Sequence, residues 1–550
     1  MDAADDKEPE SAPREAAKDE GPAREPEEDT PVRPEGPSFE IARFLFLRLL
    51  GVVYSFAFLV LVLQGPALIG DRGLLPAASF VERATLAFGL KGAFTRAPSL
   101  FFVIGAGEGT LSVFWWVGLV VSIAVALGLT NALAQLVLWA IYLSFIHVGQ
   151  VFYGYGWESL LVETGFLAIF LCPVRTASPF PKAAVPKVPV WLLRWLVFRV
   201  MLGAGLIKLR GDPCWRDLTC LVYHYETQPS PSPLSYLFHS LPVWMLKGGV
   251  LYNHLAEIVA PFFVFWPKKA RHAAGIVIVA FQLLLIVSGN LSFFNWLTIA
   301  PALACFDDSL LRRVVPKKLS ERLLRVKDVE PPLAARVATY GYAMIVAVLS
   351  ISPTMNLLSS RQAMNTSFDP LRLVSTYGAF GSVGRERFEV ILEGTDSPSP
   401  GPDAVWREYQ FPCKPGDPDR RPCVASPYHY RLDWQLWFAS FRGYRGEPWI
   451  ANLVYKLLRG ERGVKSLLAV DPFPDAPPRW IKATLYRYEL KRVGEGPGWW
   501  RRSPVGEFLK PLSVEDPGLL QFLAAHKYIP SDKAPPLPPV TPPPEEEEDE

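Results

Sequence analysis

The feature that most constrains this chain is a series of long apolar runs between positions 44 and 352. The first run, Phe44–Gln64, is long enough to cross a bilayer, which needs about 20 residues. Only 20% of the residues are charged, whereas globular domains average about 25%. The runs exclude a chain that is disordered throughout and predict a polytopic α-helical membrane domain over residues 39–355.

Nine of these segments are expected to span the membrane. The stretch Phe80–Gly107 is amphipathic and interrupted by charges, so it is expected to lie at the membrane interface or to re-enter the membrane. Almost nothing joins the seventh segment to the eighth, so we expect these two to form a tight antiparallel hairpin. The nine are Phe44–Gln64, Leu111–Leu129, Ala132–Gly149, Trp157–Cys172, Val190–Leu209, Gly248–Trp266, His272–Ser288, Leu291–Phe306 and Ala334–Ser352.

The two ends of the chain differ from the apolar middle. Residues 1–38 are acidic and rich in proline, and residues 532–550 are rich in proline and glutamate. Neither end has enough apolar surface to offset its ordering entropy, so both are predicted to be disordered tails. The net charge of +2 excludes a nucleic-acid binder that works by bulk positive charge, and no nucleic-acid partner is expected.

The basic loops predict the orientation of the chain. Cytoplasmic loops of membrane proteins carry an excess of Lys and Arg. With the N-terminus in the cytoplasm, nine crossings place three basic loops on that side, and everything after Pro353 then lies outside the cytoplasm. These loops contain Arg175, Lys182 and Lys187, then Lys268, Lys269 and Arg271, then the run from Arg312 to Lys327.

Residues 356–531 are predicted to form a soluble β-rich domain on the non-cytoplasmic side. Short alternating segments are bounded by Gly, Pro and Asp clusters, which is typical of strands and turns. One helix, Pro448–Arg459, is expected to interrupt the strands. The expected strands are Arg387–Leu392, Val405–Phe411, His429–Trp434 and Lys482–Leu490.

The six cysteines agree with this topology. Cys214 and Cys220 lie in a non-cytoplasmic loop, and Cys413 and Cys423 lie in the outer domain. Two close pairs on the oxidising side favour two local disulfides. A zinc site is disfavoured because the sequence contains no CxxC motif, so no metal is expected.

Charged residues inside the predicted spans are costly and suggest function by default. The favoured interpretation is that they neutralise one another and fix helix packing, with Glu163 and Arg199 as a buried ion pair between two spans. The alternative is an acid/base site in which Lys208 or His254 accepts a proton beside Glu257, since His254 and Glu257 share a helix face. The candidate catalytic residues are therefore Lys208, His254, Glu257, Glu158, Glu163 and Arg199.

Several long stretches resemble the lipase maturation factor family. They are YGYGWESLLVETGFLAIFL at 153–171, GAGLIKLRGDPCWRDLTCLVYHYETQP at 203–229, STYGAFGSVGRERFEVILEGT at 375–395 and EYQFPCKPGDPDRRPCVASPYHYRLDWQLWF at 408–438. The resemblance covers about residues 40 to 515, nearly everything except the tails.

The resemblance implies a multi-pass protein of the endoplasmic reticulum membrane with its C-terminal domain in the lumen. Members of the family are associated with maturation of secreted homodimeric lipases into active dimers. The outer portion of the family is thought to engage the client, which here directs attention to Tyr377–Phe441. The composition also fits a bacterial member, for which the corresponding place is the inner membrane and the periplasm.

Two functions follow from these observations. The leading one is a non-enzymatic maturation and assembly factor, without a cofactor, whose partners are a client lipase and the lipid bilayer. The alternative is a membrane enzyme with an intramembrane acid/base site. A weaker likeness in fold to the membrane domain of vitamin K-dependent γ-carboxylases would make Lys208 and Glu158 the first residues of that enzyme to test. GxSxG, HExxH and P-loop motifs are absent from the sequence.

Overall fold

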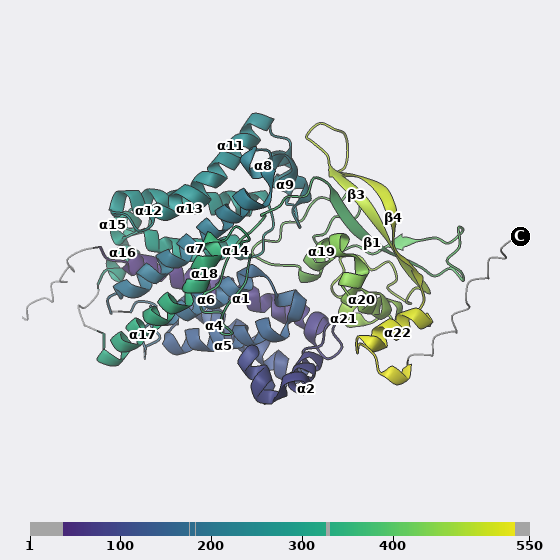
Figure 1. The fold of residues 1–550 in the computed structure, drawn as a ribbon, viewed down its shortest axis with the longest axis horizontal. Helices are drawn as coiled ribbons and strands as arrows, with labels where there is room; N and C mark the ends of the chain where they lie inside the picture. The colour runs from purple at the N-terminus through teal and green to yellow at the C-terminus, as the bar shows by residue number, and fades with distance from the viewer. Residues whose placement is uncertain (1–36, 175, 182, 326–330, 534–550) are drawn as a thin grey trace, which may run out of the picture.

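A computed structural model describes residues 37–174, 176–181, 183–325 and 331–533. Apart from residues 37–38 and 532–533, both predicted tails lie outside these residues, as do Arg175, Lys182 and the end of the basic run Arg312–Lys327. Figure 1 shows a bundle of helices on one side and a sheet with its covering helices on the other. The helical membrane part therefore precedes a C-terminal part with a sheet, as expected, but that part also contains several helices and is α/β rather than β-rich.

Within the described residues, five helices are long and apolar enough to cross a membrane. At a rise of about 1.5 Å per residue, each exceeds or approaches the roughly 30 Å of a bilayer core. They are α1 (Glu40–Ile69), α4 (Glu108–Leu127), α7 (Lys187–Gly211), α13 (Lys268–Ser288) and Leu333–Leu358, which consists of α17 (Leu333–Leu349) and α18 (Ile351–Leu358).

The other four predicted spans contain shorter helices. Two are much shorter than a bilayer is thick, since α6 (Gly156–Ile169) has 14 residues and α14 (Phe294–Ala302) has 9. Both are almost fully buried among other helices, so their ends contact protein rather than lipid. The remaining helices are α5 (Ala132–Val148) and a run of α11 (Val243–His254), a π-helical turn (Leu255–Val259) and α12 (Ala260–Phe263). The expected hairpin of α13 and α14 is present.

Contacts at the two ends of the bundle show which helix ends lie together. At one end, the backbone N–H groups of Glu40 and Ile41 donate to Asp308 at 2.9 Å, and Glu40 accepts from the Val185 N–H. At the other end, Gln64 donates to the His429 carbonyl at 2.7 Å. The N-terminus of α1 and the C-terminal part therefore lie at opposite ends of the bundle.

The stretch predicted to be interfacial forms α2 (Ala77–Arg96) and α3 (Phe101–Ile104). Helix α2 is kinked at Gly89, whose φ of 68° is unfavourable for residues with a Cβ. Leu86, Phe88 and Leu90 beside the kink are at least half exposed. An exposed apolar kink at the edge of a membrane domain fits an interfacial position.

Short helices connect the main elements. On the side of the C-terminal part they are α8 (Pro213–Arg216), α9 (Leu221–Thr227), α10 (Pro233–His239) and the 3₁₀ turn Gln150–Tyr153. On the opposite side they are α15 (Asp308–Leu311), α16 (Lys317–Leu323) and the 3₁₀ turn Leu303–Cys305.

The described C-terminal residues form a four-stranded antiparallel sheet in the order β2-β1-β3-β4. The strands are β1 (Arg387–Thr395), β2 (Arg407–Glu408), β3 (Trp480–Leu490) and β4 (Trp500–Leu512). Helices α19 (Arg431–Gly446) and α20 (Trp449–Leu458) pack against the sheet, followed in the chain by α21 (Arg462–Lys465), α22 (Pro517–Ala525) and the 3₁₀ turn Ser531–Lys533.

One strand prediction was wrong, and another was confirmed only in part. The expected strand His429–Trp434 is instead the start of α19, because Leu432, Leu436 and Ala439 recur at helical spacing and form one buried face. The expected strand Val405–Phe411 pairs with β1 only at Arg407–Glu408. The prediction also missed β4, whose sequence includes two prolines and a glycine and is largely exposed. Edge strands tolerate such residues.

Candidate functional site

The charges predicted inside the membrane part form three buried clusters. In the first, Glu158 near the start of α6 pairs with Arg431 at the start of α19, with Nη1 and Oε1 2.7 Å apart. Neither side chain is exposed to solvent. Tyr142 of α5 donates to the same carboxylate, and Arg431 also donates to the Phe152 carbonyl at 2.6 Å. This cluster joins the membrane part to the C-terminal part.

The second cluster contains the predicted ion pair of Glu163 in α6 and Arg199 in α7, which is confirmed. Glu163 also accepts from the Ser375 N–H at 3.0 Å and from the Tyr377 hydroxyl at 2.6 Å. Arg199 donates to the Ser375 carbonyl at 2.7 Å. The pair therefore holds the segment that leads into the sheet against two helices. A buried ion pair that also bonds the backbone of a third segment acts as a positioning device.

The third cluster lies in the half of α7 that faces the C-terminal part. Lys208 Nζ is 2.6 Å and 2.7 Å from the two carboxylate oxygens of Glu257 and 2.9 Å from Asn253 Oδ1. Asn253 donates in turn to Glu257 at 3.1 Å. The Lys208 ammonium also lies 5.0 Å from the Trp215 ring centroid. All three ammonium hydrogens can therefore find an acceptor or a π face.

His254 is not hydrogen-bonded to this cluster. Its Nε2 atom pairs with the Trp215 carbonyl at 2.9 Å, whereas Asn253 contacts both Lys208 and Glu257. The π-helical turn Leu255–Val259 changes the angular spacing along this helix, so a face expected from α-helical geometry is displaced. Asn253, four positions before Glu257, takes the place that the sequence assigned to His254.

A cavity of about 70 Å³ adjoins Lys208, Asn253 and Glu257. This is room for a few water molecules. Its walls are mainly apolar, with Met201, Phe281, Leu285 and Phe294 among them, and His224 and Phe380 close one side. Burial lowers the pKa of His224, which lies in α9 outside the spans, to about 3, so its ring is neutral at physiological pH.

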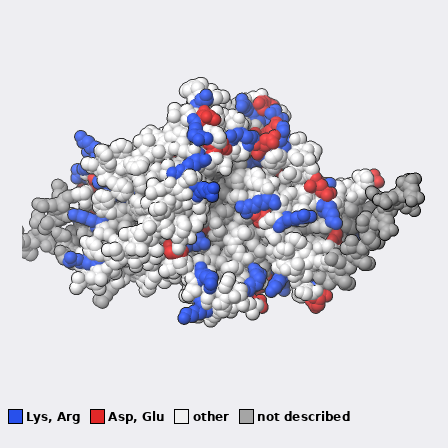
Figure 2. Space-filling model, viewed as in Figure 1, with Lys and Arg blue, Asp and Glu red and all other residues white. Residues whose placement is uncertain are grey.

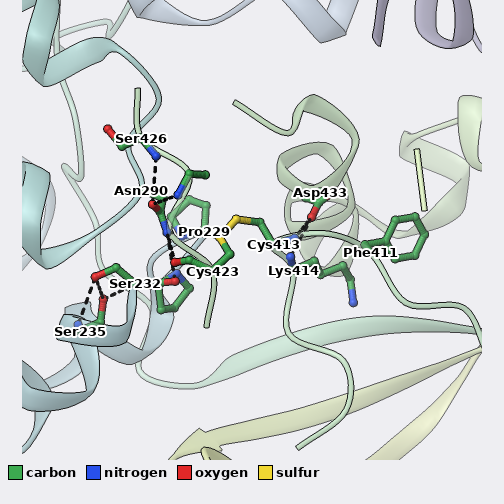
Figure 3. Close-up of a disulfide and its surroundings, with 12 residues drawn as sticks. Pro229, Ser232, Ser235, Asn290, Phe411, Cys413, Lys414, Cys423, Ser426 and Asp433 are labelled. Carbon is green, nitrogen blue, oxygen red and sulfur yellow. Dashed lines mark hydrogen bonds between the residues drawn. A yellow bond between two sulfur atoms is a disulfide. The ribbon is translucent and has the colours of Figure 1, made fainter. Parts of the chain in front are cut away.

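Both expected cysteine pairs are disulfides in the structure, Cys214–Cys220 and Cys413–Cys423. Figure 3 shows the second between Asn290 and Asp433. Asn290, in the α13–α14 turn, donates to the Cys423 carbonyl at 3.0 Å, and Asp433 accepts from the Cys413 N–H at 2.6 Å. The disulfide loop is therefore fixed both to the membrane part and to α19.

Among the described residues, one cluster of potential metal ligands is present, Asp212 with Cys214 and Cys220. The two sulfur atoms are bonded to each other. Cysteine coordinates a metal as a thiolate. While the disulfide is intact, Cys214 and Cys220 have no thiolate, so this group lacks the ligands for zinc.

The sequence interpretation missed several partners of the buried charges. Arg431 was placed in a strand, and Tyr142, Asn253 and Tyr377 were not singled out. No signal in the sequence singled out Arg431, because Lys208, near the same end of the predicted span Val190–Leu209, offered a cation at the depth of Glu158.

The fold and these contacts define a multi-pass membrane protein whose C-terminal α/β domain is docked on one end of the helix bundle through buried ion pairs. Comparison with known families is specific. Residues 41–313 match the model of the lipase maturation factor transmembrane domain, and residues 373–510 match that of the lipase maturation factor C-terminal domain. The chain belongs to the lipase maturation factor family.

Individual relatives agree over nearly the whole chain. Lipase maturation factor 1 of Mus musculus is 46% identical over 522 residues, which cover 90% of this chain and 91% of that protein. Lipase maturation factor 1 of Homo sapiens is 45% identical over 537 residues, 93% of each chain. Lipase maturation factor 2 of Homo sapiens is 31% identical over 622 aligned positions, covering 90% of this chain and 86% of that protein. No solved structure matches.

Proposed function

We propose that this chain is a maturation factor that helps secreted lipases fold and assemble in the endoplasmic reticulum. The observation that carries the proposal is the extent of the similarity to lipase maturation factor 1, which spans both the membrane part and the C-terminal part. The buried contacts between these parts support a single functional unit. Buried contacts hold the C-terminal domain against the helix bundle, which would suit the presentation of a binding surface.

Physical association with a client tests this function. The full-length chain would be expressed with a newly synthesised secreted homodimeric lipase, cross-linked in cells and purified. We expect the lipase to co-purify, and a secreted protein of similar size that is not a lipase to be absent. Equal recovery of both proteins, or of neither, would contradict the proposal.

We further propose that the membrane part crosses the bilayer nine times, with the N-terminus in the cytoplasm and the C-terminal domain in the lumen. The alternation of helix ends supports this arrangement, since the start of α1 contacts Asp308 and its far end contacts His429. The long helices alone would give five crossings. The two arrangements differ in the placement of the loops that flank α11 and α12.

Labelling at the positions of two exposed lysines distinguishes nine crossings from five. Nine crossings place Lys247, in the first half of α11, in the lumen and Lys269, at the start of α13, in the cytoplasm. Five crossings leave both on the same side. In a background in which the free cysteines Cys172 and Cys305 are serine, Lys247→Cys and Lys269→Cys would be labelled in sealed microsomes with an impermeant maleimide. We expect labelling of Lys269→Cys alone. Labelling of neither cysteine, which five crossings predict with the N-terminus in the cytoplasm, or equal labelling of both would contradict nine crossings.

The client surface is proposed to lie within Tyr377–Phe441. This stretch begins at the segment held by Glu163 and ends on α19, which Glu158 holds. Both anchors are buried, so the two ends of this stretch are held against the membrane part. Preorganisation of this kind lowers the entropic cost of binding a client.

A second function, a membrane enzyme, is favoured by one observation, the cavity beside Lys208 and Glu257. An ammonium and a carboxylate that face an apolar cavity can exchange a proton with a bound substrate. Glu158, Glu163 and Arg199 are each paired with groups in other elements, so their contacts fit a packing role. Lys208 and Glu257 are the pair on which this function depends.

Single and paired substitutions separate the two functions. Lys208→Met or Glu257→Gln alone leaves one charge buried without its partner, so a loss of yield is expected from packing alone. The double variant Lys208→Met/Glu257→Gln removes both charges. Normal membrane yield with normal lipase maturation in the double variant would identify a packing pair. Normal yield with maturation lost would support the enzyme.

A further inference from the structure

A groove of about 350 Å³ lies between the membrane part and the C-terminal domain. Three segments form its walls: α9, the loop 380–386 and the middle of α19. On the face drawn in Figure 2, a hollow lies near the middle of the molecule, where Figure 1 places α9 and α19, and Lys and Arg side chains gather beside it. The groove is separate from the Lys208 cavity but shares His224 and Phe380 with it.

The α19 wall of the groove is aromatic. The ring of Trp437 lies edge-to-face with the rings of Phe438 and Phe441, at centroid distances of 5.0 Å and 4.8 Å. Phe441 is 55% exposed. The opposite wall contains the rings of Phe380 and His224, which are in edge-to-face contact with their centroids 4.7 Å apart. Exposed aromatic clusters around a concavity are typical of protein-binding sites rather than of an inert surface.

Two exposed guanidinium groups adjoin the lining residues: Arg385 lies between Gly384 and Glu386 in the chain, and Arg442 lies over the Phe438 ring at 5.2 Å. Arg442 on α19 is 59% exposed, whereas its partner Glu447 is 3% exposed. Arg385 on the loop is 45% exposed, whereas its partner Asp212 is 11% exposed. In both pairs the carboxylate lies behind the arginine, so an incoming ligand meets the positive group first. The lining also includes one carboxylate, Glu386, which pairs with Arg487 at 3.1 Å.

We propose that this groove binds a segment of the client lipase in which an aromatic or large aliphatic side chain is flanked by acidic residues. The apolar side chain would pack on Trp437 and Phe441, and the acids would pair with Arg385 and Arg442. Ser382 in the lining is exposed and supplies a hydroxyl group for the main chain of the segment. This groove would then be the site at which the chain contacts its client, so the proposal rests on the proposed function.

The aromatic wall is tested by cross-linking and co-purification of a secreted homodimeric lipase with the full-length chain. Phe441→Ala and Trp437→Ala are expected to reduce lipase recovery at least tenfold, since aromatic anchors dominate interfaces of this kind. Phe368→Ala is the matched control, because Phe368 is 50% exposed and does not line the groove. Phe441 is mostly exposed, so its substitution decides the outcome even if Trp437→Ala lowers the membrane yield.

The contribution of the arginines beside the groove is tested by removing one charge. Arg442→Gln keeps a donor for Glu447 but removes the positive charge. We expect about fivefold to tenfold lower recovery of the lipase, and a smaller difference from the wild type in high salt. Arg479→Gln is the charge-matched control. Arg479 is exposed and precedes β3 at the end that pairs with Thr395, whereas the groove lies beyond the Arg387 end of β1. Recovery with this control is expected to equal the wild type.

The results distinguish this inference from the function on which it rests. Normal recovery with Phe441→Ala and Arg442→Gln, while the wild type captures the lipase, would overturn the groove and leave the proposed function intact. Failure of the wild type to capture the lipase would overturn both. Loss restricted to the groove variants, with Phe368→Ala and Arg479→Gln unaffected, is the result that the proposal requires.

Discussion

Arg431 and Glu158 are 273 residues apart in the chain and form an ion pair at 2.7 Å from which solvent is excluded. One belongs to the first turn of the C-terminal helix α19 and the other to the short membrane helix α6. The C-terminal domain thus supplies the counter-charge of a carboxylate buried in the membrane part. This relationship explains why α6 can carry a glutamate at that position, and it couples the folding of the two parts.

Breaking this pair is expected to be severely destabilising. Arg431→Met leaves Glu158 buried without a cation, which costs about 3–5 kcal/mol. We expect a large loss of membrane yield and a lower thermal unfolding midpoint in detergent. The double variant Glu158→Gln/Arg431→Met removes both charges and should recover much of the loss. A double variant as unstable as Arg431→Met would contradict the pairing.

The turn between α13 and α14 should be important for the order of the disulfide loop. Asn290 donates to the Cys423 carbonyl and accepts from the Ala425 N–H at 2.8 Å. Asn290→Ala leaves these buried groups without partners, at a cost of about 1–3 kcal/mol. We expect faster hydrogen exchange across residues 413–426. Asn356→Ala, which removes exposed hydrogen bonds to Ala363, is the control and should leave that segment unchanged.

Titration of Asp433 is expected to make the stability of the fold depend on pH, and one substitution isolates this effect. Burial raises the pKa of Asp433 from 3.8 to about 6, although the Cys413 and Lys414 N–H groups donate to it. The folded chain therefore binds a proton more readily than the unfolded chain between about pH 4 and pH 6. This group then contributes stability that increases as pH falls through that window and is lost as pH rises.

Asp433→Asn keeps an acceptor for both N–H groups and removes the titration. Between pH 7 and pH 4.5 the unfolding midpoint of the wild type should rise relative to that of the variant, corresponding to roughly 2 kcal/mol. The comparison is a difference between two proteins, so titration of other groups cancels. Parallel midpoints over this range would show that Asp433 does not titrate there.

The Cys413–Cys423 disulfide closes a loop with a sequence separation of 10. In the chain-entropy model, a loop of this length stabilises the folded state by about 2–3 kcal/mol. The double variant Cys413→Ser/Cys423→Ser should therefore unfold at a lower temperature in detergent. The wild type under reducing conditions should show a larger shift, because reduction also opens Cys214–Cys220. No change in either case would mean that Asn290 and Asp433 alone hold the loop.

The helical part was predictable because apolar length is a strong signal. The runs that became α1, α4, α7 and α13 were located within a few residues. The short helices α6 and α14 were also located, but their burial among other helices depends on tertiary contacts. A run of apolar residues does not distinguish contact with lipid from contact with protein.

The site was only partly predictable. The pair of Glu163 and Arg199 followed from two opposite charges in neighbouring spans, and its confirmation needed no knowledge of the C-terminal domain. Arg431 was missed because its local sequence, HYRLDW, alternates like a strand while its helical periodicity appears only further on. Asn253 was missed because a π-helical turn cannot be read from α-helical spacing.

The most direct test of the account is the specific activity of a secreted lipase, measured as activity per unit of lipase protein, in cells that lack their own maturation factor. This ratio separates maturation of the lipase from its synthesis. Expression of the chain should restore dimeric, active lipase, and the Phe441→Ala variant at equal membrane yield should restore much less. Unchanged specific activity with abundant, correctly inserted wild-type chain would contradict the account.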